Sequence, residues 1–194
     1  MNHIVFQSKC QGYSHIKSDL ECQDSTLVKK TEKYAIAVVA DGHGSASYFR
    51  SSRGSLFATE AAITAIEELL ETILSDKSNM DDFCASIDKH LIQLERSVIA
   101  RWHERVEDDY SKNPFLDSEI LKVDEKHKEK YLKGERIEAA YGSTLIAVAC
   151  TDAFWFGIHI GDGKCITCDY RGNFAEPIPW DEKCFLNVTT SISD

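Results

Sequence analysis

An apolar run ends at a carboxylate and a glycine turn in the stretch Tyr34-Ala35-Ile36-Ala37-Val38-Val39-Ala40-Asp41-Gly42-His43-Gly44. A short continuous apolar run bounded by a turn is typical of a β-strand that is covered on both faces. The two glycines permit a turn with close approach of the backbone, so the strand should stop at Asp41. We therefore predict a buried strand over residues 34–40 that holds the Asp41 carboxylate at its end.

Helical periodicity follows this turn in two long segments. The first runs from about Gly54 to Leu74 and places its isoleucines on one face and its glutamates elsewhere. The second runs from about Asp81 to Val106, with an apolar stripe that includes Trp102. Because each segment has one apolar face, we predict an antiparallel pair of helices lying on a sheet.

A strongly charged segment occupies residues 107–136 and contains Asn113-Pro114. The residue before a proline disfavours helix, so the second helix should end before this segment. We interpret residues 107–136 as an exposed insertion with a short helix around Glu119–Leu132. A solvated run of charges explains the composition better than a surface for binding a partner.

The pattern is β on both sides of this helical region. Residues 1–30 indicate a short strand, a polar loop and a second strand. Two further strands are predicted over residues 143–150 and 153–160, and a third over 164–169, each bounded by turn residues. Strands, then two helices, then a meander predict an α+β sandwich rather than a parallel βαβ fold. We treat residues 1–194 as a single domain.

Composition excludes several classes of function. The net charge of −10 argues against a nucleic-acid partner, because phosphate backbones need a lysine- and arginine-rich surface. No apolar run approaches the length that crosses a bilayer, and the N-terminus lacks the pattern of a secretion signal. Seven cysteines without such a signal indicate free thiols in a reducing compartment, so we expect a cytoplasmic protein.

The residue types around Asp41 suit a site for hard divalent cations. Mg²⁺ prefers oxygen ligands and keeps several waters, and Gly42 lets its own carbonyl approach an ion without a side chain in the way. Asp24 begins an earlier strand that could run beside this one. Two such carboxylates could share a pair of ions that activate water for attack on phosphorus. The alternative is that Asp41-Gly42 is merely a turn.

Several motifs occur in an order that resembles one family. Ala40-Asp41-Gly42-His43-Gly44 resembles the Asp-Gly-His-Gly signature of the protein phosphatase 2C-type family, and Ser14-His15 with Cys22-Gln23-Asp24 resembles the first motif of its bacterial branch. Gly142-Ser143-Thr144 and Gly161-Asp162-Gly163 are similar to two later family motifs. The similarity covers about residues 5–190, with two long helices between the second and third motifs.

This resemblance implies a four-layer α-β-β-α sandwich with two antiparallel sheets that hydrolyses phosphoserine or phosphothreonine in proteins. It implies Mn²⁺ or Mg²⁺ as cofactor, as two ions with a third, weaker site. Asp24 and Asp41 would hold metal through carboxylates, Gly42 through its carbonyl, and Asp162 would line the third site. With Asp41, His43 would act in catalysis, as the general acid that protonates the leaving oxygen.

The sequence departs from the family pattern at three points. Gln23 stands where many members carry glutamate, and the arginine that grips phosphate is missing, with only His15 and Lys17 nearby. Two later metal-binding motifs, an Asp-Gly strand end and an Asp-Asn pair, are not found after Asp162. We therefore expect an N-terminal portion of the domain, incomplete at its C-terminus, with weak metal binding and little or no turnover.

Two alternatives remain open at this point. Cys165 and Arg171 have the Cys-x₅-Arg spacing of cysteine-dependent phosphatases, in which a thiolate attacks phosphorus. The residues between them lack the glycine-rich loop that this chemistry needs, and a chelator would distinguish the two mechanisms. The second alternative is a non-catalytic phosphatase-like module that binds a phosphoprotein without hydrolysing it.

Overall fold

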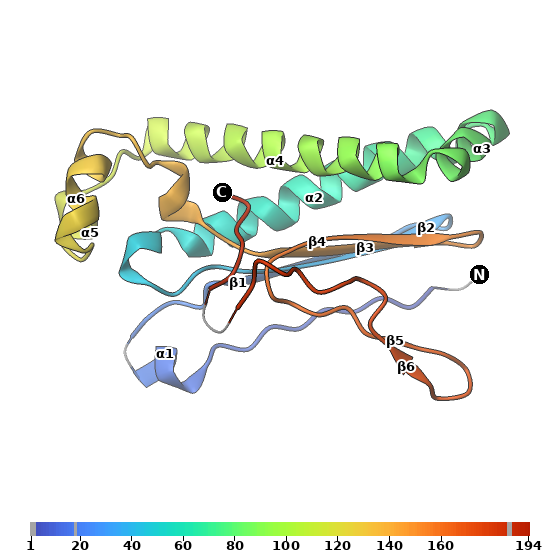
Figure 1. The fold of residues 1–194 in the computed structure, drawn as a ribbon, viewed down its shortest axis with the longest axis horizontal. Helices are drawn as coiled ribbons and strands as arrows, with labels where there is room; N and C mark the ends of the chain where they lie inside the picture. Colours follow the sequence, from blue (N-terminus) through green and yellow to red (C-terminus); the bar gives the residue numbers. More distant parts are fainter. Residues whose placement is uncertain (1–2, 18, 186–187) are drawn as a thin grey trace.

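A four-stranded antiparallel sheet forms the centre of the computed structural model, which describes residues 3–17, 19–185 and 188–194. The strand order is β1-β2-β3-β4, and Figure 1 shows the sheet below the long helices. A second sheet pairs two short strands. The strands are β1 (Asp24–Lys30), β2 (Tyr34–Asp41), β3 (Leu145–Thr151), β4 (Trp155–Ile160), β5 (Thr167–Cys168) and β6 (Phe174–Ala175).

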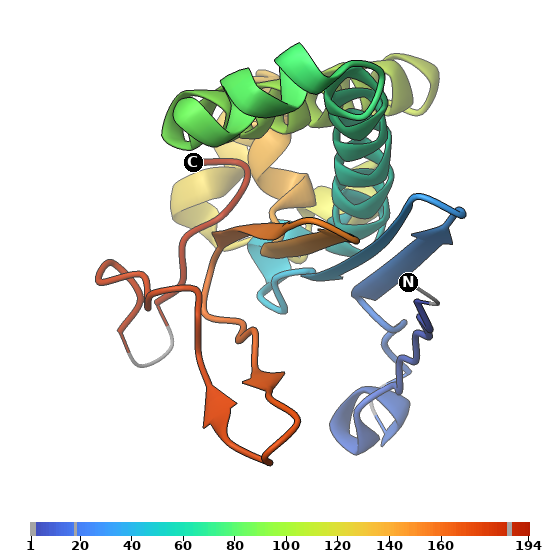
Figure 2. The same ribbon diagram turned by 90° about the vertical axis from the view of Figure 1, so that its right-hand side faces the viewer.

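Helices cover one face of the four-stranded sheet, as Figures 1 and 2 show. The longest are α2, which lies against the strands, and α4, which packs on α2. Shorter helices precede and follow them. The helical elements are α1 (Tyr13–Lys17), η1 (Ala46–Tyr48), α2 (Ser51–Ile73), α3 (Lys77–Ala85), α4 (Ile87–Lys112), α5 (Asp117–Ile120), α6 (Glu125–Leu132) and η2 (Glu138–Tyr141).

Small side chains allow α2 to approach the sheet closely. Ala58, Ala61 and Ala62 are fully buried on this helix, in the same hydrophobic core as Ile36 and Val38 of β2. Burial on this scale contributes about 25 cal/mol for each Å² of apolar surface removed from water. At Gly54 the helix also lies close to η2, since a Cβ atom there would be 1.7 Å from the carbonyl oxygen of Tyr141. The apolar run of β2 and the small residues of α2 thus let the helix pack directly on one face of the sheet.

The predicted α+β class and the antiparallel arrangement are confirmed. The structure shows one helical layer on a four-stranded sheet and a separate two-stranded sheet. Figure 2 shows the N-terminal segment and the β5–β6 hairpin on the side of the sheet opposite the helices. The four-layer sandwich and the single-domain assignment stay predictions.

Three element predictions need correction. The helix predicted over residues 81–106 is two helices that meet at Ser86, and the second continues to Lys112. The break lets Phe83 turn onto Phe154 and Phe156, with ring centroids 5.2 and 5.8 Å apart. The strand predicted over residues 164–169 is reduced to Thr167–Cys168, and no strand precedes β1 in the described residues 3–17 and 19–23.

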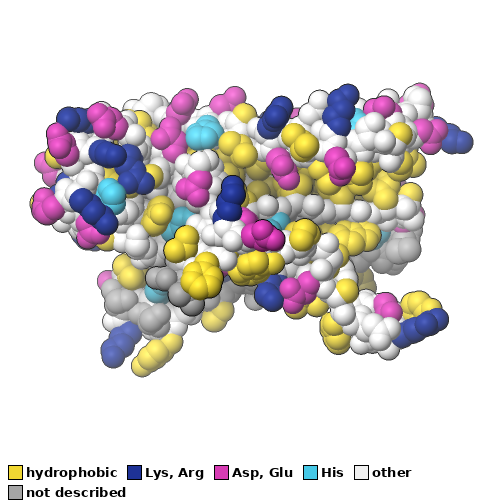
Figure 3. Space-filling model, in the orientation of Figure 1, with side chains coloured by type: hydrophobic (Ala, Val, Ile, Leu, Met, Phe, Trp, Pro, Cys, Tyr) yellow, Lys and Arg dark blue, Asp and Glu magenta, His cyan; other side chains and the backbone are white. Residues whose placement is uncertain are grey.

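The charged segment 107–136 is anchored by buried side chains and is not wholly exposed. Ile120, Val123 and Tyr131 are buried, and the Tyr131 hydroxyl donates a hydrogen bond of 2.7 Å to the carbonyl of Ser47. The charged side chains of the segment still reach the surface. Figure 3 shows acidic and basic side chains interspersed over the helical layer. Whether this segment is an insertion within the domain stays a prediction.

Arg50 joins the charged segment to the start of α2. Its guanidinium is only 4% exposed and makes a two-bond ion pair with Glu119, each bond 2.9 Å. It also donates to the Tyr141 hydroxyl at 2.8 Å and lies over the ring of Phe115, 4.7 Å from the centroid. A buried charge needs such complete pairing, because an unpaired guanidinium would be costly to desolvate.

A search of the described helices for a membrane-spanning segment was negative: none combines sufficient length with sufficient apolar character.

Candidate metal and phosphate site

Two predicted carboxylates meet at one end of the sheet. Asp24 is the first residue of β1 and Asp41 the last of β2, and the two are direct partners in the antiparallel register. Directly opposed residues have Cβ atoms about 4.5–5.5 Å apart, so their side chains interact. Burial, together with the charge and hydrogen bonding of Asp24 and the charge of Asp162, raises the pKa of the Asp41 carboxyl to about 6. Like charges held together in this way favour a bound cation.

Gly42 is required by the close packing of the backbone around it. A Cβ atom here would lie 2.6 Å from the carbonyl oxygen of Ser51 and 2.8 Å from that of Gln23. The amide of Gly42 donates to the Gln23 carbonyl at 3.1 Å. Within the described part of the chain, no donor forms a hydrogen bond to the Gly42 carbonyl oxygen. That oxygen therefore has no competing hydrogen bond, and its role as a metal ligand stays a prediction.

These groups fit a hard divalent ion that keeps part of its water shell. Two carboxylates and a carbonyl are the oxygen ligands that Mg²⁺ and Mn²⁺ accept, with waters completing the coordination. No group of three or more His, Cys, Asp or Glu side chains in the described ranges is arranged as a complete protein-only metal site. The donor set thus suits a partly hydrated ion and does not form a closed cage.

The neighbouring residues hold the Asp41 backbone rigidly. The Thr144 hydroxyl accepts from the Asp41 amide at 3.0 Å, while the Thr144 amide and the Ser143 hydroxyl donate to the Asp41 carbonyl at 2.8 and 3.0 Å. This bracing role of the Gly-Ser-Thr motif could not be read from the sequence. Its only signal was two small hydroxyl residues at the start of a strand.

His43 and Asp162 lie on a cavity of about 400 Å³ beside Asp41. Burial lowers the pKa of the His43 imidazole, while the charges of Asp194 and Asp162 oppose that shift. Asp162 accepts a hydrogen bond of 3.3 Å from the Thr189 hydroxyl. The structure therefore brings Asp41, His43 and Asp162 to one cavity, with Tyr48 as a further lining residue that the sequence did not single out.

Gln23 and the basic residues of the first motif have different surroundings. The Gln23 amide donates to the Ser51 hydroxyl at 2.9 Å, so it braces the start of α2. The charge of His15 acts to lower the pKa of Asp41, in opposition to burial and to the charges of Asp24 and Asp162. Lys9, which the sequence did not single out, donates from its ammonium to the Asp24 carbonyl at 3.3 Å.

The cysteine alternative does not fit its surroundings. Burial raises the pKa of the Cys165 thiol, whereas an attacking thiolate needs a lowered pKa. Arg171 is exposed and lies over the ring of Tyr170, 5.2 Å from its centroid. The backbone between them forms the β5–β6 hairpin, in which Asp169 accepts from the amides of Arg171 and Asn173. This geometry presents no cradle of amides to a phosphate.

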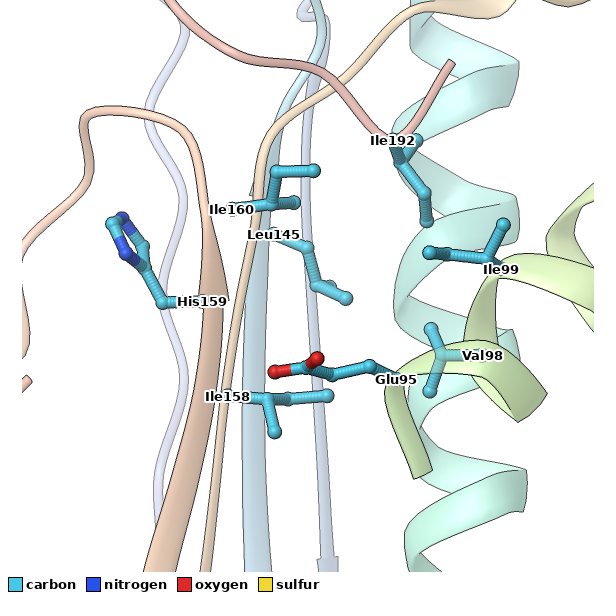
Figure 4. A pocket seen from close by; sticks show the side chains of 8 residues that line it. All are labelled: Glu95, Val98, Ile99, Leu145, Ile158, His159, Ile160 and Ile192. Atoms are coloured by element: carbon cyan, nitrogen blue, oxygen red, sulfur yellow. The ribbon is translucent and has the colours of Figure 1, made fainter. Parts of the chain in front are cut away.

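A second cavity, of about 140 Å³, is apolar and lies between α4 and β4, away from Asp41. Figure 4 shows isoleucines 158, 160 and 192 around it, while His159 points away on the other side of β4. The Nε2 atom of His159 is buried and finds no hydrogen-bond partner among the described residues.

Comparison with known proteins agrees with the motif order. The family model of protein phosphatase 2C matches residues 11–194. A search of curated proteins found no match to the chain. The chain belongs to the protein phosphatase 2C family, whose members are typically metal-dependent phosphatases. Membership of the bacterial branch stays a prediction.

Proposed function

We propose that this protein is a metal-dependent phosphatase that hydrolyses phosphoserine or phosphothreonine in a phosphoprotein. The observation that carries the proposal is the register pair Asp24–Asp41, with a free Gly42 carbonyl beside it and a cavity of about 400 Å³ on its flank. Family membership supports the reaction class. An extended phosphopeptide suits an open cavity at a sheet end better than a nucleic acid does, because the chain carries a net charge of −10.

Each site residue has a part in this proposal. Asp24 and Asp41 would hold two Mn²⁺ or Mg²⁺ ions through carboxylate oxygens, and Gly42 would add its carbonyl. When bound, such ions acidify water and polarise the phosphoryl group. Asp162, which lines the same cavity, would border a third, weaker ion site. His43 would protonate the leaving oxygen, and the charges of Asp162 and Asp194 favour its protonated imidazole against the opposing effect of burial.

All seven cysteines are free thiols, which supports a reducing compartment such as the cytoplasm as the place of action. The alternative of a non-catalytic binding module shares the same cavity and carboxylates. It differs only in whether a bound phosphopeptide is cleaved, so both can be tested in one experiment.

The test measures Mn²⁺ binding by calorimetry and hydrolysis of a phosphothreonine peptide by phosphate release. We expect the unmodified chain to bind Mn²⁺ and Asp41→Asn to lose that binding. His43→Gln should bind Mn²⁺ normally while its turnover falls by about 10²–10⁴-fold, the usual contribution of a general acid. Cys165→Ser is the control for the thiol mechanism and should have no effect.

The outcomes separate the alternatives. Unchanged Mn²⁺ affinity in Asp41→Asn would contradict the metal site. Mn²⁺ and phosphopeptide binding without phosphate release would favour the binding module. Activity that survives a chelator but not Cys165→Ser would restore the cysteine mechanism.

A further inference from the structure

The imidazole of His43 is oriented by packing and not by a hydrogen bond. The backbone amide of His43 donates to the Gly142 carbonyl at 3.1 Å, which fixes the backbone but does not set the direction of the ring. Across the residues that the structure describes, no hydrogen bond to either ring nitrogen is formed. Catalytic histidines are commonly oriented by a hydrogen bond to the second ring nitrogen. Here another contact must set the direction of the ring.

That contact is the ring of Tyr48. The two ring centroids lie 4.7 Å apart with an interplanar angle of 61°, an edge-to-face arrangement. Aromatic pairs in this geometry contribute about 0.5–1.5 kcal/mol beyond their buried area. Gly142 closes the other side, because a Cβ atom there would lie 2.7 Å from Tyr48 Cδ1 and 2.8 Å from His43 Cδ2. The missing side chain of Gly142 therefore creates the space in which the two rings meet.

Tyr48 is itself fixed by the residues on both sides of it. Ser47 accepts the hydrogen bond of Tyr131 from the charged segment, at 2.7 Å. Phe49 packs edge-on against Tyr131, with centroids 5.3 Å apart, and the next residue is the buried Arg50. The turn Ala46–Tyr48 is thereby attached to α6, and the half-buried Tyr48 lines the cavity.

We propose that Tyr48 is a positioning residue that aims the His43 imidazole into the cavity, with Gly142 providing the space for both rings. This inference rests on the proposed function of the site. The ring, not the hydroxyl, does the positioning, because the Tyr48 hydroxyl forms no hydrogen bond within the described ranges. A misplacement of about 1 Å in a reacting group can lower a rate by about 10²-fold.

The test records the ring resonances of His43 by NMR in the full chain without added metal, assigned through their loss in His43→Gln. Tyr48→Leu should shift these resonances, because it removes the ring current, whereas Tyr48→Phe should leave them near their original positions. Gly142→Ala should shift them as well, since it displaces both rings. The matched control is Tyr170→Leu, at a tyrosine that is 89% exposed and far along the chain, which should change nothing.

Kinetics supply the second measurement. Tyr48→Leu should lower kcat by about 10–100-fold with little change in KM, whereas Tyr48→Phe should keep kcat near that of the original chain. Unshifted His43 resonances in Tyr48→Leu would overturn the inference. So would a loss of kcat in Tyr48→Phe equal to that in Tyr48→Leu, since the hydroxyl would then carry the effect. We expect low turnover from the unmodified chain; if it neither binds Mn²⁺ nor releases phosphate, the proposed function fails, and the resonances alone decide whether Tyr48 orients the ring.

Discussion

The backbone of Asp41 is clamped by Thr144 and Ser143, while its carboxyl lies beside that of Asp24 and in the field of Asp162. A free side chain could swing away from its neighbours to relieve repulsion. The two carboxyl groups start from directly opposed strand positions, so they stay close even when their side chains rotate. The metal-free protein therefore stores electrostatic repulsion at this point, and a divalent ion would release it.

This repulsion predicts opposite effects of Asp41→Asn with and without metal. In the metal-free protein the variant should unfold at the same temperature as the original or at a higher one, because one negative charge is gone. Mn²⁺ at one hundred times its Kd should stabilise the original chain by about 2.7 kcal/mol, and the variant hardly at all. Thermal unfolding with and without Mn²⁺ measures both. Glu32→Gln, at an exposed glutamate, is the control, and a metal-free Asp41→Asn less stable than it would contradict the argument.

The junction of α2 with η2 is a close backbone contact. The backbone of Gly54 lies against that of Tyr141, and the Trp102 indole donates to the Gly54 carbonyl at 3.0 Å. This single glycine therefore sets how close α2, α4 and the start of β3 can come. Because Trp102 is fully buried, the indole nitrogen needs this partner.

Gly54→Ala should destabilise the protein even though alanine is the better helix former. Helix propensity alone would favour alanine by about 1 kcal/mol. The new Cβ would lie 1.7 Å from a backbone oxygen, so the two elements must separate, and we expect a net loss of about 2 kcal/mol or more. Urea unfolding measures the difference. Gly44→Ala, whose nearest neighbour would be the Gln23 side chain at 3.7 Å, should be close to neutral.

Elements with a strong local period could be predicted from the sequence, and contacts between distant segments could not. The apolar run of β2 ends at Asp41 as expected, and α2 begins within a few residues of its predicted start. The break at Ser86 was missed because no glycine or proline marks it, and its cause is the packing of Phe83 on β4.

The candidate site divides in the same way. Asp24, Asp41 and Gly42 carry signals in the sequence itself, as an acidic residue at a strand end or a glycine in a turn. Tyr48 carries none, because its importance depends on Gly142, which is distant in the sequence and close only in the fold.

At the scale of the whole molecule, the buried ion pairs of Arg50 link the charged segment to the helices. The pKa of Glu119 is held below its ordinary value by hydrogen bonds from Arg50 and the Leu116 amide, despite the opposing effect of burial. Hydrogen bonds from Tyr141 and Arg53 likewise hold the pKa of Asp109 down, again against burial. Both carboxylates thus bind protons less readily in the folded protein than in the unfolded chain.

This difference predicts that part of the stability is lost in acid. A lowered folded-state pKa stabilises the protein fully above the unfolded pKa, about 4.3 for glutamate, and the contribution disappears as the pH falls through the folded value. Glu119→Gln should therefore lower the free energy of unfolding by about 2 kcal/mol near pH 7, the range of hydrogen bonds to charged groups, and by progressively less below about pH 4.

Urea unfolding of the variant and the original chain from pH 7 to pH 3 measures the difference. The control is Glu129→Gln, since the Glu129 side chain is 78% exposed in its pair with Lys133 and such pairs contribute about 0–1 kcal/mol. An ion pair that depends on charge must weaken when the carboxylate is protonated. If the loss of unfolding free energy caused by Glu119→Gln stayed constant down to pH 3, the ion pair with Arg50 would therefore not be what anchors the charged segment.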